Sequence, residues 1–215
     1  MVKTYTAEEV SLHCTVDDCW VSIFNNVFDI TELIKENKGP LADPLIKQAG
    51  QSITHWFDLK TKQLKTYIDE VRNIRVPYTP EGRFIHVPPA DPVEWDTTCA
   101  EVWWEDPQYI IGHLTERNRM VRVINMLSTS EDIISTCAED TVDDILEKYL
   151  EYNAHARSYT WKAIANDALY NLDMTKTLEE NGVVDESELF YDLGIPDDTY
   201  IPSVMIYYND DLTYA

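Results

Sequence analysis

Two short apolar runs lie close together near the start of the chain. Trp20–Ile23 and Val27–Ile30 are each four residues long and flank the pair Asn25-Asn26. Because Asn tolerates a positive φ, two apolar runs around an Asn pair predict a β-hairpin. This hairpin is the first element around which the N-terminal half is expected to fold.

Three short helices are predicted to follow the hairpin. Thr31 is placed to cap the helix Glu32–Glu36, and Gly39-Pro40 is expected to end it. Pro44 can occupy the first turn of a second helix that closes at Gly50. Ser52 is placed to cap the third, which carries an apolar-flanked His55.

Capping residues also predict a helix before the hairpin. Thr6 and Glu9 have the spacing of a capping box, which places a helix over Glu8–Cys14. After the third short helix, residues 58–80 are polar and rich in Lys and Arg, and their pattern fits either a helix or extended chain. Phe84–Val87, which contains His86, is predicted to be a short strand.

The second half of the chain repeats a strand and helix pattern. Helical spacing is clear at Val142, Ile145, Leu146, Tyr149 and Leu150, behind the capping signal Asp140-Thr141. Strands are predicted at Arg119–Asn125, Asp132–Cys137, Tyr159–Lys162 and Glu188–Asp192, with an extra strand at Ile201–Tyr208. A turn is predicted at Thr177–Val183.

Between these halves lies a segment rich in Pro and Trp. The segment contains Trp95, Trp103 and Trp104, whose large apolar side chains are unfavourable in water. We therefore expect the segment to be a structured connector. The predicted domains are therefore 1–87, a connector at 88–116, and 117–215.

Charge and cysteine content limit the classes of partner. The net charge is −22, and residues 91–215 carry 7 Lys/Arg against 27 Asp/Glu. So acidic a chain disfavours nucleic acid and anionic membranes, and favours basic protein surfaces or simple solubility. The four cysteines show no zinc-site spacing, which indicates reduced thiols in a reducing, cytoplasmic setting. No apolar run is long enough for a membrane helix, and no signal peptide is expected.

The N-terminal motifs resemble the cytochrome b5 family. The matching residues are Trp20–Ile23, then Val27–Thr31, a helix and a Gly-containing break, and finally Gln48–Gly50. The resemblance implies a cytochrome b5-like fold and haem b. The chain departs from the family at both positions where the family has its axial histidines. Asn37–Pro40 replaces His-Pro-Gly-Gly, and Thr61-Lys62 stands near the second position.

His55 and His86 are the candidate haem and metal ligands that remain. The resemblance extends to a subfamily of cytochrome b5 domain-containing proteins through the motifs around these two histidines, and it implies them as substitutes. Bis-histidine ligation needs two imidazoles opposed across an apolar slot, and both residues have apolar neighbours. The alternative is that each ring packs and hydrogen-bonds without a metal.

The C-terminal half resembles the ubiquitin-like β-grasp fold, most specifically in Thr177–Val183. The fold class expected for the whole chain is thus α+β, a cytochrome b5-like domain followed by a ubiquitin-like domain. The chain ends without a di-glycine, so conjugation to other proteins is not expected.

The sequence contains no catalytic motif, so we expect no enzyme activity. The subfamily resemblance implies a structural or interaction component of the ciliary axoneme, with the radial-spoke region as one placement. Axonemal proteins would then be the partners, within the cytoskeleton. The rival hypotheses are a haem-binding redox or haem-sensing protein that uses His55 and His86, and an adapter of a ubiquitin-type pathway.

Overall fold

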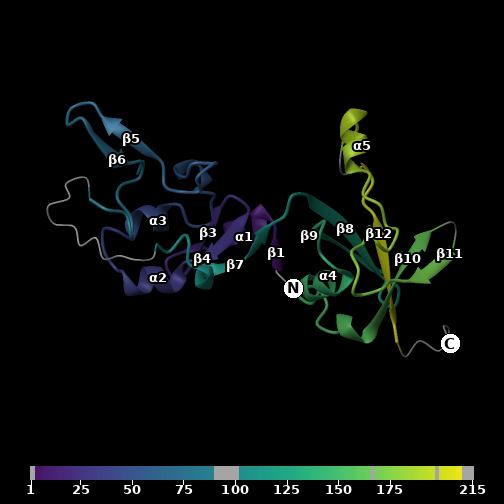
Figure 1. Cartoon of the computed structure of the whole chain (residues 1–215). Coiled ribbons are helices and arrows are strands. Elements are labelled where there is room, and N and C mark those ends of the chain that lie inside the picture. The colour runs from purple at the N-terminus through teal and green to yellow at the C-terminus, as the bar shows by residue number, and fades with distance from the viewer. Residues whose placement is uncertain (1–2, 90–101, 166–167, 197–198, 210–215) are drawn as a thin grey trace. The chain divides into compact units, whose positions relative to one another are not determined.

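The computed structural model describes residues 3–89, 102–165, 168–196 and 199–209 (Figure 1). The chain divides into two compact units, Met1–Leu114 and Thr115–Ala215. Each unit combines a five-stranded sheet with short helices, which confirms the predicted α+β class. None of the described helices is long and apolar enough to cross a membrane.

A five-stranded sheet forms the frame of the first unit. Its strands are β1 (Lys3–Tyr5), β2 (Cys14–Thr15), β3 (Asp18–Ile23), β4 (Asn26–Asp29) and β7 (Ile110–Leu114). They lie in the order β1-β7-β4-β3-β2, and β1 runs parallel to β7. The predicted hairpin is β3 and β4, but the positive φ of its turn falls on Phe24, at 54°, rather than on an asparagine. Gly112 faces Lys3 in β1, where a Cβ would collide with the Lys3 carbonyl.

Short helices accompany this sheet. Among them are α1 (Ala7–Leu12), α2 (Thr31–Glu36), α3 (Asp43–Lys47) and the 3₁₀ helix η1 (Thr54–Trp56). Thr6 and Glu9 form the predicted capping box of α1. The predicted cap of α2 is wrong: Ile30 is the N-cap, and the Thr31 hydroxyl instead accepts the Cys19 N–H at 3.0 Å. That bond ties α2 to β3.

The first unit continues well beyond residue 87. Trp103 is 1% exposed and packs edge-on against Phe28, with ring centroids 5.8 Å apart. β7 then inserts between β1 and β4. The described residues from Val102 to Leu114 therefore complete the core and sheet of this unit, where the sequence had suggested a connector at 88–116. Trp95 lies outside the described residues.

The long excursion between η1 and β7 contains a separate hairpin. Its strands are β5 (Thr66–Asp69) and β6 (Ile74–Pro77), which resolves the ambiguity of residues 58–80 in favour of extended chain. The strand predicted at Phe84–Val87 is wrong. These residues form a turn in which the Val87 N–H donates to the Phe84 carbonyl at 3.1 Å. Phe84, Ile85 and Val87 are all buried, so this turn belongs to the core.

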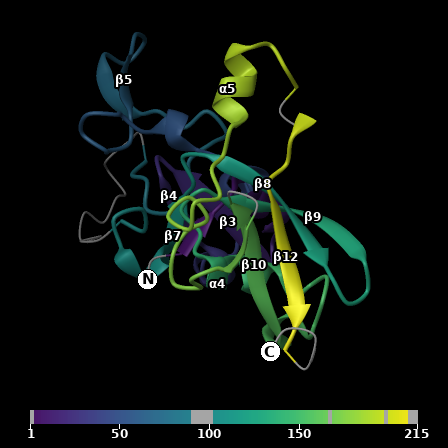
Figure 2. The same ribbon diagram turned by 90° about the vertical axis from the view of Figure 1, so that its right-hand side faces the viewer.

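The second unit has the β-grasp topology expected of a ubiquitin-like fold. Its strands are β8 (Asn118–Asn125), β9 (Ser130–Cys137), β10 (Tyr159–Ala165), β11 (Ala168–Asn171) and β12 (Ser203–Tyr208). Their order is β11-β10-β12-β8-β9, with β12 and β8 parallel at the centre (Figure 2). The described residues also include the 3₁₀ helices η3 (Pro107–Tyr109), in the first unit, and η4 (Ala156–Ser158), in the second.

Helix α4 (Val142–Tyr149) supplies the other half of this core. Val142, Ile145, Leu146 and Tyr149 are buried as the helical spacing predicted. They pack in one cluster with the inward residues of the central strands, including Val121, Val204 and Ile206.

In this unit one predicted strand is a helix, and another is a strand as predicted but has a different place in the sheet. Glu188–Asp192 lies in a helix, α5 (Ser187–Asp192), where Leu189 is 54% and Tyr191 is 79% exposed. Side chains this exposed do not pack against the sheet, so nothing holds the segment in a strand. The strand predicted as an extra one at the C-terminal end is instead β12, the central strand that closes the sheet. Its Val204 and Ile206 are fully buried.

Candidate functional site

His55 lies on η1, beside the most buried part of the first unit. The histidine itself is exposed, whereas the next residue, Trp56, is fully buried. The His55 ring meets the Trp56 ring edge-on at a centroid distance of 5.9 Å. Its backbone carbonyl accepts a hydrogen bond from the Lys65 ammonium at 2.9 Å. The short helix therefore directs the tryptophan inward, and His55 does not enter an apolar slot.

His86 lies in the buried turn and is half-buried. Its backbone has a positive φ of 65°, and its Nδ1 accepts the backbone N–H of Trp103 at 3.1 Å. Burial lowers the pKa of the imidazole below its ordinary value, which favours the neutral ring. Because Nδ1 is the acceptor, the proton of the neutral ring is on Nε2.

These two histidines, as the structure places them, do not fit bis-histidine ligation of a haem. An axial imidazole presents an unprotonated nitrogen to iron and donates its other N–H to a carbonyl or carboxylate. His86 has the reverse arrangement, since its free nitrogen carries the proton. His55 is exposed. Among the hydrogen bonds and ring contacts of the described residues, none joins His55 to His86.

The two positions of the family's usual ligands are engaged in other contacts. Asn37 ends α2, and its side-chain amide donates to the Leu33 carbonyl at 3.0 Å. The Lys62 ammonium lies over the Phe24 ring, 3.7 Å from its centroid. A neutral amide and an ammonium cannot replace two imidazoles as iron ligands. Within the described residues there is also no group of three or more His, Cys, Asp or Glu that could hold a metal ion.

A continuous series of aromatic rings fills the interior beside these positions. Phe24 meets Phe57 at a centroid distance of 6.4 Å, and Phe57 meets Trp104 at 5.7 Å. Trp104 continues to Trp103 at 5.6 Å, and Trp103 to Phe28 at 5.8 Å. Edge-on ring pairs of this kind stabilise a core beyond the area that they bury. Trp103 and Trp104 follow the β5–β6 hairpin in the sequence, so a segment near the C-terminal end of the unit supplies its central packing.

An open groove of about 680 Å³ remains at one end of this series. Phe24, Lys62, Trp104 and Glu105 contribute to its lining, and no histidine lies among its described lining residues. The indole N–H of Trp104 is buried without a partner among the described residues. Since an indole N–H only donates, it offers nothing to a metal.

The contact between His86 and the Trp103 backbone is not predicted by the sequence. Its signal was present: three tryptophans with no obvious place to pack. The pairing itself joins a side chain to a backbone N–H 17 residues away, and no sequence pattern reports such a bond.

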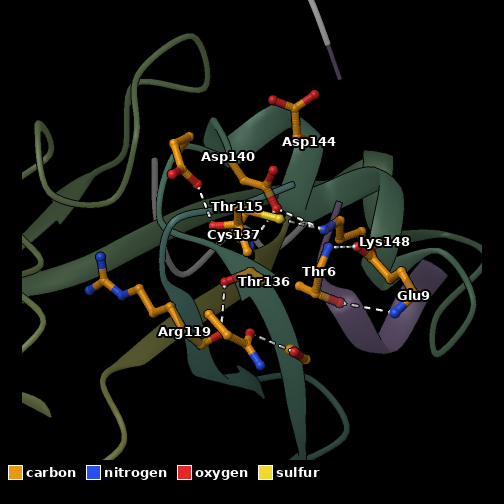
Figure 3. Close-up of polar contacts among 12 residues, drawn as sticks. Thr6, Glu9, Thr115, Arg119, Thr136, Cys137, Asp140, Asp144 and Lys148 are labelled. Atoms are coloured by element: carbon orange, nitrogen blue, oxygen red, sulfur yellow. Dashed lines mark hydrogen bonds and ion pairs between the residues drawn. The ribbon is translucent and has the colours of Figure 1, made fainter. Parts of the chain in front are cut away.

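The second unit has polar networks that serve its own fold. The buried Asp140 carboxylate pairs with Lys148 at 2.9 Å and accepts the Cys137 N–H, also at 2.9 Å (Figure 3). Burial is the main cause of the raised pKa of Asp140. Arg119 is 3% exposed and donates to the Val183 carbonyl at 2.6 Å. Each contact joins a strand or turn to its neighbour, as expected of structural roles.

Comparison with known proteins agrees with the description of the first unit. The sequence model of the family "Cytochrome b5-like Heme/Steroid binding domain" matches residues 6–73. Cytochrome b5 of Drosophila melanogaster is 41% identical over 56 residues, which is 26% of this chain and 41% of that protein. Together with the β-grasp topology of the second unit, this match defines a protein that joins a cytochrome b5-like domain to a ubiquitin-like β-grasp domain.

Full-length relatives identify the family. Cytochrome b5 domain-containing protein 1 of Xenopus laevis is 45% identical over 98% of this chain and 96% of its own length. The protein of that name from Homo sapiens is 40% identical over 98% of this chain and 92% of its own length. The chain belongs to the cytochrome b5 domain-containing protein 1 family.

Two solved structures resemble parts of the chain. Cytochrome b558 of Ectothiorhodospira vacuolata is 26% identical, with a TM-score of 0.25, over 34% of this chain and 85% of that one. A ubiquitin-like domain from Arabidopsis thaliana is 12% identical, with a TM-score of 0.30, over 46% of this chain and 84% of that one.

Proposed function

We propose that this protein is a non-catalytic interaction component of the axoneme of motile cilia, in the radial-spoke region, where it supports ciliary beating. The proposal that the protein is not an enzyme rests on the residues at the candidate site of the first unit. Asn37 stands at the first family ligand position and Thr61-Lys62 near the second, and buried aromatic rings pack the interior. The axonemal part rests on the subfamily resemblance of the sequence.

The charge of the second unit supports a role in binding proteins. It carries 7 Lys/Arg against 21 Asp/Glu, a net charge of −14. An acidic surface of this kind attracts basic protein surfaces and repels nucleic acid and anionic membranes. Basic surfaces of axonemal proteins are therefore the proposed partners of this unit.

Extraction of isolated cilia tests this proposal. We expect detergent to leave the protein with the axoneme and high salt to release it, because charge pairs at an interface weaken as ionic strength rises. Release by detergent alone, together with the soluble matrix, would contradict the proposal. A soluble matrix protein serves as the control for complete membrane permeabilisation.

The alternative is a haem-binding redox or haem-sensing protein with haem b held by His55 and His86. The name of the matched family, which includes haem, favours it. Titration of the purified chain with one equivalent of hemin separates the two proposals. A sharp Soret band that His55→Ala and His86→Ala both abolish would support the alternative. A spectrum equal to that of free hemin would remove it.

A further inference from the structure

The β5–β6 hairpin is an arm that extends from the body of the first unit (Figure 1). It forms a two-stranded sheet separate from the five-stranded one. Its base is held firmly. The Tyr78 N–H donates to the Lys65 carbonyl at 2.7 Å, and the Lys65 N–H donates to the carbonyl of the buried Trp56 at 2.9 Å. Val76, at 5% exposure, anchors the second strand. The arm is thus tied to the core at one end and open at the other.

Large apolar side chains along this arm remain in water. Tyr67 is 53% exposed, Ile68 is 61% and Val71 is 93%. An isolated two-stranded hairpin is marginally stable in water, and a cluster of exposed apolar residues marks an interaction surface. The tip is nevertheless ordered, because the Asp69 carboxylate accepts the Val71 N–H at 2.9 Å.

One edge of the arm can accept a further strand. Hydrogen-bonded pairs alternate along an antiparallel ladder, and Tyr78 with Lys65 is one such pair. The N–H and C=O groups of Thr66 and Ile68 therefore point away from β6, and no described strand pairs with them. The opposite edge is blunted, since Pro77 has no N–H to offer there.

The segment that leads into the arm is basic although the chain is acidic. Lys60, Lys62 and Lys65 precede β5, and the hairpin itself (66–77) carries two Lys/Arg and two Asp/Glu. Residues 60–78 carry five Lys/Arg and two Asp/Glu, whereas the whole chain has a net charge of −22. Arg75 faces Ile68 across the ladder, so the two side chains share a face. Arg75 is exposed, and none of the ion pairs found within the described residues involves it. Tyr67 and Val76 share the other face, and Asp69 and Ile74 form the next pair along it.

We propose that the edge of β5 binds an extended acidic segment of a partner protein as an added strand. Carboxylates at alternate positions of that segment would face Arg75, and its apolar residues would pack on Tyr67. Main-chain bonds to Thr66 and Ile68 would supply affinity, and the two faces would supply specificity. This inference rests on the proposed interaction function, and it names the partner chemistry of the first unit.

A fluorescent octapeptide of alternating glutamate and valine tests the edge directly. Its anisotropy is measured with the full chain at low salt. We expect saturable binding that Arg75→Glu weakens about tenfold, since a repulsive charge pair replaces an attractive one. The matched control is Lys38→Glu, which makes the same charge change at an exposed lysine in the 37–40 loop. It should change affinity by less than about twofold. Far-UV circular dichroism verifies that both variants are folded.

A second peptide separates strand addition from simple charge attraction. Methylation of alternate backbone nitrogens removes the donors of one strand edge and leaves every side chain in place. We expect the methylated peptide to lose binding. The proposal is overturned if wild type does not bind the glutamate–valine peptide, or if the methylated peptide binds equally well. It is also overturned if Arg75→Glu and Lys38→Glu have the same effect. Displacement of the peptide by oligouridylate, a polyanion that cannot add as a β-strand, would overturn it too.

The cilia extraction distinguishes this proposal from the proposed function. If Arg75→Glu weakens peptide binding about tenfold while the wild-type chain leaves cilia with the matrix, the proposed binding edge is supported and the axonemal role is contradicted. If wild type stays with the axoneme but does not bind the peptide, the axonemal role stands and the arm does not carry it.

Discussion

Replacing Trp103 with alanine would remove a fully buried indole from the interior of the first unit. Trp103 is 1% exposed, and an indole buries on the order of 200 Å², worth about 5 kcal/mol at about 25 cal/mol per Å². The change also removes the edge-on contacts with Phe28 and Trp104. Since part of the cavity would relax, we expect the free energy of unfolding of this unit to fall by about 3–5 kcal/mol.

Native-state hydrogen exchange of the β3 and β4 amides measures this change for the first unit alone. Leu59→Ala is the matched control, because Leu59 is 70% exposed and its truncation should stay within about 0.5 kcal/mol. A loss below about 1 kcal/mol for Trp103→Ala would refute the reasoning. It would mean that the segment 102–114 is not part of this core, and that the domain boundary near residue 87 is correct.

Three further predictions concern single side chains. Burial lowers the pKa of His86, so the stability that its neutral form supplies is present above pH 6.5 and is lost as pH falls through the lowered folded value; the pH dependence of unfolding between 7 and 5 should be shallower in His86→Gln. Burial raises the pKa of the Cys19 thiol to about 12, while Cys14 is exposed, so iodoacetamide should alkylate Cys14 in the native chain and Cys19 only after unfolding, as peptide mass spectrometry would detect. Thr6→Ala should destabilise the first unit by about 1 kcal/mol in denaturant titrations, with Thr6→Ser close to wild type, because only alanine removes the capping oxygen.

Local signals in the sequence were sufficient wherever a single element decided the structure. The capping box of α1 and the buried stripe of α4 follow from residues within one or two turns, so both were predicted correctly. The β3–β4 hairpin was found for the same reason, although the strain of its turn falls on Phe24.

The errors arose where distant contacts outweighed local preference. Apolar residues at Leu189–Tyr191 favour a strand by composition, yet no sheet partner is available there and the segment is helical. The pattern at Ile201–Tyr208 predicts an extra strand and not a central one, because the sequence does not show that β8 leaves an edge free for a parallel partner.

The candidate site shows the same division. The sequence indicates His55 and His86 as candidate ligands. Whether they are free to bind a metal depends on the Trp103 N–H, which bonds His86, and on the direction in which η1 holds His55. Both are set by packing.

The pairing of β1 with β7 has a consequence for how the chain folds as it is made. Lys3 and Gly112 are 109 residues apart, and their strands lie side by side in one sheet. Contacts of such long range are slow to form, because a long loop must close before they contribute. During synthesis the β3–β4 hairpin can form early, but the sheet of the first unit stays incomplete until Leu114 has left the ribosome. Until then the aromatic interior lacks Trp103 and Trp104, so the nascent first unit is expected to need protection by chaperones.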